Sequence, residues 1–339
     1  MVGNACRSDE HETVGRYPGQ AQSMTELDGA ERLDPVLRAV ATTRTDFSLD
    51  SIRVMREPFN QRRREAAEHT DAAGVQIKED TVISESGGVP VRIYRGGRSP
   101  APAVVYCHAG GFALGNLDTD HRQCLELALR ARCTVVSVDY RLAPEHPYPA
   151  ALSDAGAVLN WVAANATELG VDAGRLALAG SSAGAALVAC MAHRAAEGSL
   201  PPIVFQLLHQ PVLDDRATAS KTEFRTSPAF DGEAAELMWR YYLGMDTGSP
   251  DAVPARRDEL DGLPPALITC AEVDPFRDEA VDYALRLLHA GVSTELHVFA
   301  GTCHGFDSLL PDWSISERLF SLQGEALRRV FGAGPLPLL

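Results

Sequence analysis

Short apolar runs alternate along the chain with segments whose apolar residues recur at helical spacing. Such a rhythm is typical of parallel strands joined by helices that cover both faces of one sheet. Two glycines at positions 87 and 88 separate the first two runs and indicate a hairpin. We expect strands at 75–83, 89–94, 102–107, 134–138, 175–179 and 203–209, and helices at 120–132, 150–164 and 183–196.

The rhythm fails between residues 214 and 260 and then resumes. This stretch is rich in Pro, Asp and Gly and contains one aromatic helix, expected at 233–243 and ended by Gly244. A strand at 266–270, a helix stopped by Gly291 and a strand at 294–299 follow it. The last helix opens with a capping-box pattern, Ser314-x-x-Glu317. We therefore expect residues 214–260 to be an insertion that forms part of a lid.

The chain before the first strand divides into two parts. Residues 1–24 are polar and lack periodicity, so we expect them to form a disordered extension. Residues 25–70 contain an irregular helical pattern with a basic cluster at 62–64. Because this second part precedes the sheet, it is expected to contribute lid helices.

Composition limits the class of protein. The 339 residues are 45% hydrophobic and 23% charged, as in soluble globular enzymes. A formal net charge of −15 disfavours nucleic acid and anionic membranes as partners, and Lys78 and Lys221 are the only lysines. The seven cysteines are scattered without metal-binding spacing, so we expect reduced thiols and no metal. Without a signal sequence or a long apolar span, the protein is expected to be cytoplasmic and not inserted in a membrane.

Gly180, Ser182 and Gly184 form a G-x-S-x-G pattern. The pattern alone is weak, but an apolar strand leads into it and an Ala-rich helix leads out. This strand–turn–helix arrangement exposes a nucleophilic serine on a sharp turn. We therefore predict Ser182 as the nucleophile, whereas the adjacent Ser181 is not expected to react.

A serine hydroxyl attacks an acyl carbon efficiently only when a base removes its proton, and a carboxylate must orient that base. His304 follows the strand at 294–299, and Asp274 follows the strand at 266–270. The chain order Ser, Asp, His is that of α/β-hydrolases. We predict His304 as the base and Asp274 as the acid. The alternatives are His108, His209, His289 or His297 as the base, and Glu272 or Asp278 as the acid.

A tetrahedral intermediate needs backbone N–H groups aimed at its negatively charged oxygen. Residues 107–112 follow a predicted strand and read as the H-G-G-G type of loop that supplies such donors in lipases. We predict that Gly110, Gly111 and Ala183 form this oxyanion hole. His108 is expected to anchor the loop.

These motifs together resemble the hormone-sensitive lipase family, the bacterial family IV esterases. The segments that carry the resemblance are 107–112, 138–150, 180–184, 274–279 and 304–306, in the family's order. Two positions depart from the family pattern: Ala109 replaces the first glycine of H-G-G-G, and Ser181 replaces the aspartate of G-D-S-A-G. The resemblance implies an α/β-hydrolase fold with a mostly parallel eight-stranded sheet, a core at 71–213 and 261–335, N-terminal lid helices at 25–70 and a lid insertion at 214–260.

The predicted function is hydrolysis of short- to medium-chain carboxylic esters by a serine carboxylesterase, through an acyl-enzyme. Fold and triad leave an amidase, a lactonase or a deacetylase open, and a small-molecule receptor on the same fold is a further alternative. The residues imply no cofactor and no metal. The expected partner is a small-molecule ester, and a homodimer is left open.

Aromatic residues of the lid are candidates for the substrate pocket. In the helix expected at 233–243, apolar residues form two stripes, Leu237 with Tyr241 and Met238 with Tyr242. One stripe can pack the lid on the core, and the other would then face Ser182. We predict a pocket that favours roughly C2 to C6 acyl chains and is lined by Phe112, Phe230, Met238, Trp239 and Tyr242.

Overall fold

The computed structural model describes residues 27–332 except residues 73, 86 and 247. The predicted extension at 1–24 lies outside this range, as do the first two residues of the predicted lid and the last three of the predicted core. None of the helices in this range is long and apolar enough to span a membrane.

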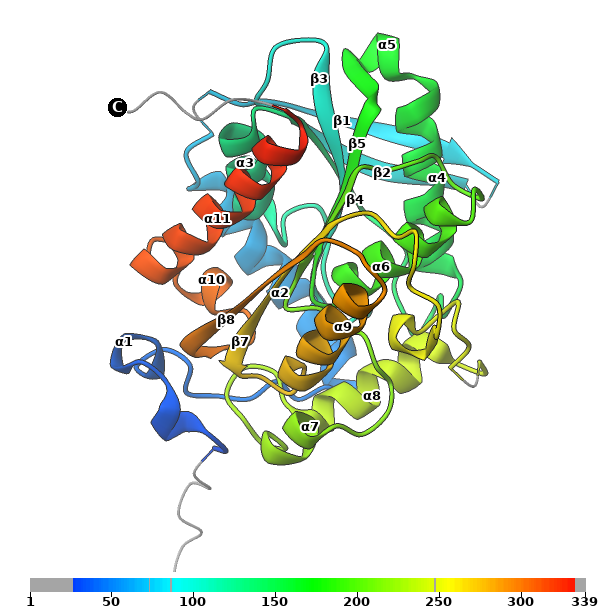
Figure 1. Ribbon diagram of the computed structural model, residues 1–339. Helices are drawn as coiled ribbons and strands as arrows, with labels where there is room; N and C mark the ends of the chain where they lie inside the picture. Colours follow the sequence, from blue (N-terminus) through cyan, green and yellow to red (C-terminus); the bar gives the residue numbers. More distant parts are fainter. Residues whose placement is uncertain (1–26, 73, 86, 247, 333–339) are drawn as a thin grey trace, which may run out of the picture.

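Eight strands form one sheet at the centre of the molecule: β1 (Gln76–Ser84), β2 (Gly87–Arg95), β3 (Ala101–Cys107), β4 (Thr134–Val138), β5 (Val171–Ser181), β6 (Phe205–His209), β7 (Ala266–Val273) and β8 (Thr294–Cys303). Their order across the sheet is β1-β2-β4-β3-β5-β6-β7-β8 (Figure 1). The β1–β2 and β2–β4 pairs are antiparallel, and every other neighbouring pair is parallel. The predicted mostly parallel sheet of an α/β-hydrolase is therefore confirmed.

Each central strand contributes side chains to two hydrophobic cores, because successive residues of a strand point to opposite faces. In β3, Val105 and Cys107 belong to the larger core, whereas Val104 and Tyr106 belong to the smaller one. All seven residues of β3 are buried. Because β3 is covered on both faces, its residues form an unbroken apolar run in the sequence.

Helices cover both faces of the sheet, as the alternating pattern predicts (Figure 1). The smaller core lies under α3 (His121–Ala131) and α11 (Ser314–Val330). The larger core lies under α4 (Ala150–Ala164), α6 (Ala183–Ala196) and α9 (Arg277–His289). Four further elements are short: α5 (Ala166–Leu169), α10 (Phe306–Leu309) and the 3-10 turns η1 (Ala30–Arg32) and η2 (Pro254–Arg256).

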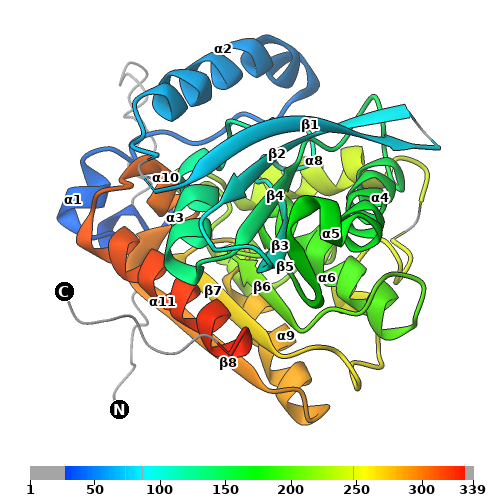
Figure 2. The ribbon, with the colours of Figure 1, turned by 90° about the horizontal axis from the view of Figure 1, so that it is seen from above.

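A cap is built from two segments that are far apart in the sequence. The N-terminal segment contains α1 (Pro35–Arg38) and α2 (Leu49–Glu68), and the insertion contains α7 (Ala219–Glu223) and α8 (Gly232–Leu243). In Figure 2, α2 lies apart from the helices that cover the sheet. A β-bridge joins Arg44 to Ala229, and the Arg44 guanidinium pairs with Asp231 at 2.6 Å. These contacts unite the two segments.

One of two local predictions is wrong in detail. Helix α11 begins at Ser314 with Trp313 as its N-cap, and no side-chain capping bond is formed. The Glu317 carboxylate instead binds Arg130 at 2.6 Å, so the attraction of a guanidinium on α3 replaces the capping box. The predicted hairpin is confirmed, because β1 and β2 pair antiparallel; Gly87 is the first residue of β2 and pairs with Ser84, so the two glycines directly follow the turn.

Candidate active site

Ser182 lies on a sharp turn between β5 and α6. Its backbone has φ 55° and ψ −119°, a conformation that is rare for a residue with a side chain. The turn requires its two glycines: a Cβ at Gly184 would lie 2.0 Å from the carbonyl oxygen of Cys107, and one at Gly180 would lie 2.6 Å from the backbone of Gly184. The G-x-S-x-G pattern is therefore a steric requirement of this turn.

Three side chains form a continuous hydrogen-bonded chain at this turn. His304 Nε2 lies 2.8 Å from Ser182 Oγ, and His304 Nδ1 lies 2.9 Å from Asp274 Oδ2. The other carboxylate oxygen of Asp274 accepts a hydrogen bond from the Phe276 N–H at 2.8 Å. A carboxylate beside Nδ1 favours the tautomer that carries its proton there, which leaves Nε2 free to accept the serine proton.

The sheet brings these three residues together although they are far apart in the sequence. Ser182 directly follows β5, Asp274 follows β7, and His304 follows β8. These strands are parallel, so their carboxyl ends meet at the same edge of the sheet. Asp274 is fully buried there, whereas Ser182 and His304 border a cavity.

The other histidines considered from the sequence are engaged elsewhere. His209 binds Asp307 through Nε2 at 3.1 Å and Thr269 through Nδ1 at 2.8 Å. His297 pairs with Glu295 on β8, and His289 lies in the last turn of α9. His108 is buried in the loop after β3.

The alternative acids are also engaged elsewhere. Glu272 accepts hydrogen bonds from the Gly301 N–H and from Arg32. Asp278 accepts the N–H of Ser220 at 2.8 Å. Neither carboxylate contacts His304, so the described residues contain one hydrogen-bonded Ser–His–Asp chain.

Gly110 and Gly111 border the same cavity as Ser182. Within the part of the chain that the structure describes, neither of their N–H groups has an acceptor. Both residues have positive φ, and a Cβ at Gly110 would lie 2.0 Å from the Leu114 carbonyl oxygen. Ala183 is the first residue of α6, where a helix leaves its N–H groups without an intrahelical partner. Two of the three residues predicted for the oxyanion hole therefore border the cavity, and the third, Ala183, directly follows Ser182.

The loop that holds Gly110 and Gly111 is fixed by a buried polar network. The His108 ring stacks on Tyr140 at 4.2 Å between centroids, and the Tyr140 hydroxyl donates to the His108 carbonyl at 2.7 Å. Asp120 accepts the Ala109 N–H at 2.8 Å. Sequence reasoning missed Asp120, whose only signal was its position at the start of a predicted helix. The Ala109 N–H is bonded to Asp120 and is therefore not an oxyanion donor. Alanine at this position leaves the N–H groups of Gly110 and Gly111 available.

The cavity above Ser182 has a volume of about 530 Å³. It also contacts Gln210, whose Oε1 accepts the Gly305 N–H at 2.6 Å and which sequence reasoning missed. A larger hollow of about 1040 Å³ lies over α4 and contains no residue of the Ser–His–Asp chain. On the cap side, the smaller cavity is lined by the apolar residues Phe47, Met55, Phe59 and Phe230, and Arg62 and Arg63 also border it.

The structure differs from the predicted pocket at four of its five positions. Phe112, Met238, Trp239 and Tyr242 are buried in the larger core and do not border the cavity. The rings of Phe112 and Tyr242 stack at 3.9 Å, so the stripe of α8 predicted to face substrate packs on the core. Phe230 borders the cavity as predicted and lies 5.7 Å from the His304 ring.

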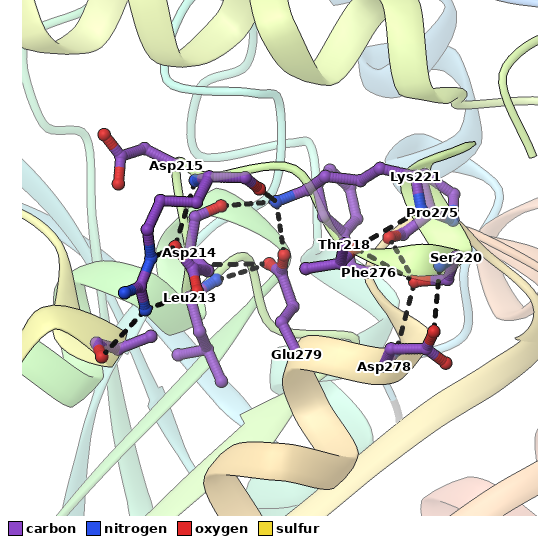
Figure 3. A network of polar contacts seen from close by, with 12 residues as sticks. Leu213, Asp214, Asp215, Thr218, Ser220, Lys221, Pro275, Phe276, Asp278 and Glu279 are labelled. Carbon is purple, nitrogen blue, oxygen red and sulfur yellow. Dashed lines mark hydrogen bonds and ion pairs between the residues drawn. The ribbon is translucent and has the colours of Figure 1, made fainter.

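A second buried network braces the loop that carries Asp274 (Figure 3). Lys221 Nζ lies 2.5 Å from Glu279 Oε2 and also donates to the carbonyls of Asp214 and Arg216. The other oxygen of Glu279 accepts the Leu213 N–H at 2.7 Å. Burial raises the pKa of Glu279 to about 7, and the attraction of Lys221 offsets only part of this.

Next to this network, the Ser220 hydroxyl donates to the Pro275 carbonyl at 2.8 Å (Figure 3). Pro275 directly follows Asp274 in the chain. The start of the cap insertion is therefore bonded to the turn that holds the buried carboxylate.

Comparisons with known proteins show the family to which this chain belongs. A family model described as the alpha/beta hydrolase fold matches residues 104–308. Esterase LipI of Mycobacterium tuberculosis is 40% identical over 282 residues, which cover 81% of this chain and 88% of LipI. Carboxylesterase NlhH of the same species is 40% identical over 285 residues, with the same coverage.

Solved structures agree as well. The crystal structure of esterase LipW from Mycobacterium marinum has 68% sequence identity and a TM-score of 0.89, covering 91% of this chain and 99% of that one. A bacterial heroin esterase has 35% identity and a TM-score of 0.84, covering 89% of this chain and 98% of that one. The chain therefore belongs to the α/β-hydrolase family, in its hormone-sensitive lipase type.

Proposed function

We propose that this carboxylic ester hydrolase cleaves short- to medium-chain esters through an acyl-enzyme formed on Ser182. The observation that carries the proposal is the hydrogen-bonded chain from Ser182 through His304 to Asp274, at 2.8 and 2.9 Å. It borders a cavity that is also lined by Gly110 and Gly111, whose N–H groups have no acceptor among the residues that the structure describes. A nucleophile, a base, an orienting acid and oxyanion donors are the parts that acyl transfer needs.

The first half of the proposed reaction forms the acyl-enzyme. Ser182 Oγ attacks the ester carbonyl while its proton moves to His304 Nε2, and the buried Asp274 carboxylate stabilises the imidazolium. The N–H groups of Gly110, Gly111 and Ala183 stabilise the negative oxygen of the intermediate. His304 then gives the proton to the leaving alkoxide, and the alcohol departs.

The second half repeats these steps with water. Water attacks the acyl carbon as His304 takes one of its protons, and the bond to Ser182 Oγ breaks. His304 returns the proton to Ser182, and the carboxylic acid leaves. No external electron acceptor or donor is consumed in either half.

The test is the variant Ser182→Ala, assayed with 4-nitrophenyl acetate and butyrate. We expect kcat to fall by about 10⁵- to 10⁶-fold, as when a triad nucleophile is removed elsewhere. Ser181→Ala is the matched control, because Ser181 borders the same cavity but does not bond His304. A large loss in Ser181→Ala with a small loss in Ser182→Ala would refute the assignment. Parallel assays with a matched amide and a lactone separate an esterase from an amidase or a lactonase.

A further inference from the structure

Two arginines of the cap helix α2 border the cavity above Ser182. The sequence has three consecutive arginines at 62–64, and Arg62 and Arg63 are among the residues that line the cavity. Arg64 does not line it and instead donates to Gln61 at 3.0 Å. Hydrolysis of a neutral ester by the Ser–His–Asp chain has no need of these charges. The position of these two arginines beside the cavity therefore indicates a role apart from the hydrolysis step.

Arg63 has no ionic partner of its own within the part of the chain that the structure describes. Among the described residues, it forms no hydrogen bond and no ion pair, and its guanidinium packs over the Phe59 ring at 5.1 Å. By contrast, Arg56 on the same helix binds Glu145 and two backbone carbonyls. Arg63 is only half-buried, so its five N–H donors remain available to a bound molecule.

Arg63 also borders a second hollow that is lined by four carboxylates, those of Asp118, Asp120, Asp307 and Asp312. Asp118 pairs with Arg92 and Asp312 with Arg122. The two carboxylates that act on Arg63, those of Asp120 and Asp307, are also engaged with other groups. Asp120 accepts the Tyr106 hydroxyl and the Ala109 N–H. Asp307 binds His209 at 3.1 Å. Burial lowers the pKa of Arg63, and attraction to Asp120 and Asp307 offsets this only in part. A further negative charge near Arg63 would offset the rest of the cost of burying its positive charge.

We propose that Arg63, assisted by Arg62, binds a carboxylate of the substrate, so that the preferred esters carry a carboxylate on their acyl or alcohol half. This inference rests on the proposed esterase function of the Ser182 cavity. The guanidinium fork matches a carboxylate with two parallel hydrogen bonds. A dianionic group such as a phosphate would place a second negative charge beside Asp120 and Asp307, which favours a monoanion.

The test compares two esters that differ only in one terminal group. Mono(4-nitrophenyl) adipate ends in a carboxylate where 4-nitrophenyl hexanoate ends in a methyl group. We expect Arg63→Met to lower the ratio of kcat/KM for the anionic ester over the neutral ester by about tenfold, mainly through KM of the anionic ester. Arg63→Lys keeps the charge but loses the two parallel hydrogen bonds, so its ratio should lie between that of the unaltered protein and that of Arg63→Met.

A second pair of esters places the charge on the alcohol half: 3-acetoxybenzoate and phenyl acetate. If Arg63→Met changes the anionic-to-neutral ratio of only one pair of esters, that pair shows whether the arginine binds a carboxylate on the acyl half or on the alcohol half. Arg64→Met is the matched control, because Arg64 is adjacent, exposed and outside the cavity, and it should leave both ratios unchanged. The proposal is overturned if Arg63→Met changes neither ratio more than Arg64→Met does.

Two further measurements keep this result separate from the esterase assignment. Calorimetry with monomethyl adipate and the Ser182→Ala protein measures binding without turnover, and adding Arg63→Met should weaken it by about tenfold. If no ester is hydrolysed, the proposed function fails, while this binding difference still tests Arg63. Rising salt should lower the anionic-to-neutral ratio in the unaltered protein, a test that needs no variant, and a salt-independent ratio would contradict the proposal.

Discussion

Ser182 combines a strained backbone with a reactive side chain that borders the substrate cavity. A non-glycine residue in such a conformation costs on the order of 1–3 kcal/mol and persists only where the surrounding structure over-determines it. Here β5 and α6 are buried on both sides of the turn, and glycines at 180 and 184 allow their backbones to approach. The strain places Oγ within 2.8 Å of His304 Nε2.

A test at the level of one atom is Asp274→Asn. The Phe276 N–H needs an acceptor at the Oδ1 position, so the amide oxygen should remain there and the amide NH₂ should face His304 Nδ1. Nδ1 must then accept a hydrogen bond, and the proton moves to Nε2, the atom that has to receive the serine proton. We expect kcat to fall by about 10⁴-fold with little change in KM. Glu272→Gln is the control, and an equal loss in both variants would show that the acid is misassigned.

At the scale of elements, the start of the cap insertion is bonded to the start of α9. Lys221 is one of only two lysines, and its ammonium meets Glu279 Oε2 and two backbone carbonyls (Figure 3). Three acceptors around a compact point charge suit an ammonium better than the planar fork of arginine. The pair therefore ties the cap to the start of α9, which follows the loop that carries Asp274.

Lys221→Met tests this tie. Removing one partner leaves Glu279 buried without its charge partner, and we expect the free energy of unfolding to fall by about 3–5 kcal/mol. Lys78→Met is the matched control, because Lys78 is exposed on β1 and forms a surface pair with Asp80; its effect should stay within about 0.5 kcal/mol. Urea unfolding measures both, and equal effects would show that the buried pair has no special role.

The same pair predicts a pH dependence of stability. The pKa of Glu279 is about 7 in the folded protein, above its ordinary value of 4.5. A raised pKa means that this carboxyl contributes stability below pH 4.5 and that the contribution is lost as pH rises through about 7. Between pH 5 and pH 8, unfolding in urea should therefore show a larger loss of stability in the unaltered protein than in Glu279→Gln. Identical losses would contradict the raised pKa.

At the scale of the whole molecule, the substrate cavity belongs to no single segment. Its floor is the turn after β5, one wall is α2, and Ala229 and Phe230 of the insertion close it beside His304. The Arg44–Asp231 pair and the Phe47–Phe230 contact at 5.3 Å join the two cap segments at this point. The size of the cavity is therefore set by how the cap docks on the sheet.

This closure predicts the acyl chain preference. A cavity of about 530 Å³ walled by Phe47, Met55 and Phe230 holds short chains, so kcat/KM should peak at roughly C2 to C6. Beyond that length each CH₂ gains none of the ~0.8 kcal/mol that its burial would provide. Met55→Ala should move the peak to longer chains, whereas the exposed Val54→Ala should not. A series of 4-nitrophenyl esters measures this, and rates that rise to C12 in the unaltered protein would contradict it.

The sequence by itself determined the sheet and the reactive turn. Both are encoded locally: apolar runs of strand length, helical periodicity, and glycines at positions where a Cβ would collide with the neighbouring backbone. Because parallel strands place their carboxyl ends at one edge, the residues following β5, β7 and β8 could be expected to meet there, and Ser182, Asp274 and His304 do lie in contact.

Only the tertiary structure decided which side chains face the substrate. On α8 both apolar stripes satisfy the same periodicity, and the packing of Met238 and Tyr242 on the core left Phe47 and Met55 of a distant segment to line the cavity. The sequence likewise did not show which arginines of the basic cluster at 62–64 face the cavity. Helix α2 docks so that Arg63 borders the cavity and Arg64 lies outside it. Periodicity determines that a helix has an apolar face, but the element that covers that face depends on contacts between residues distant in the chain.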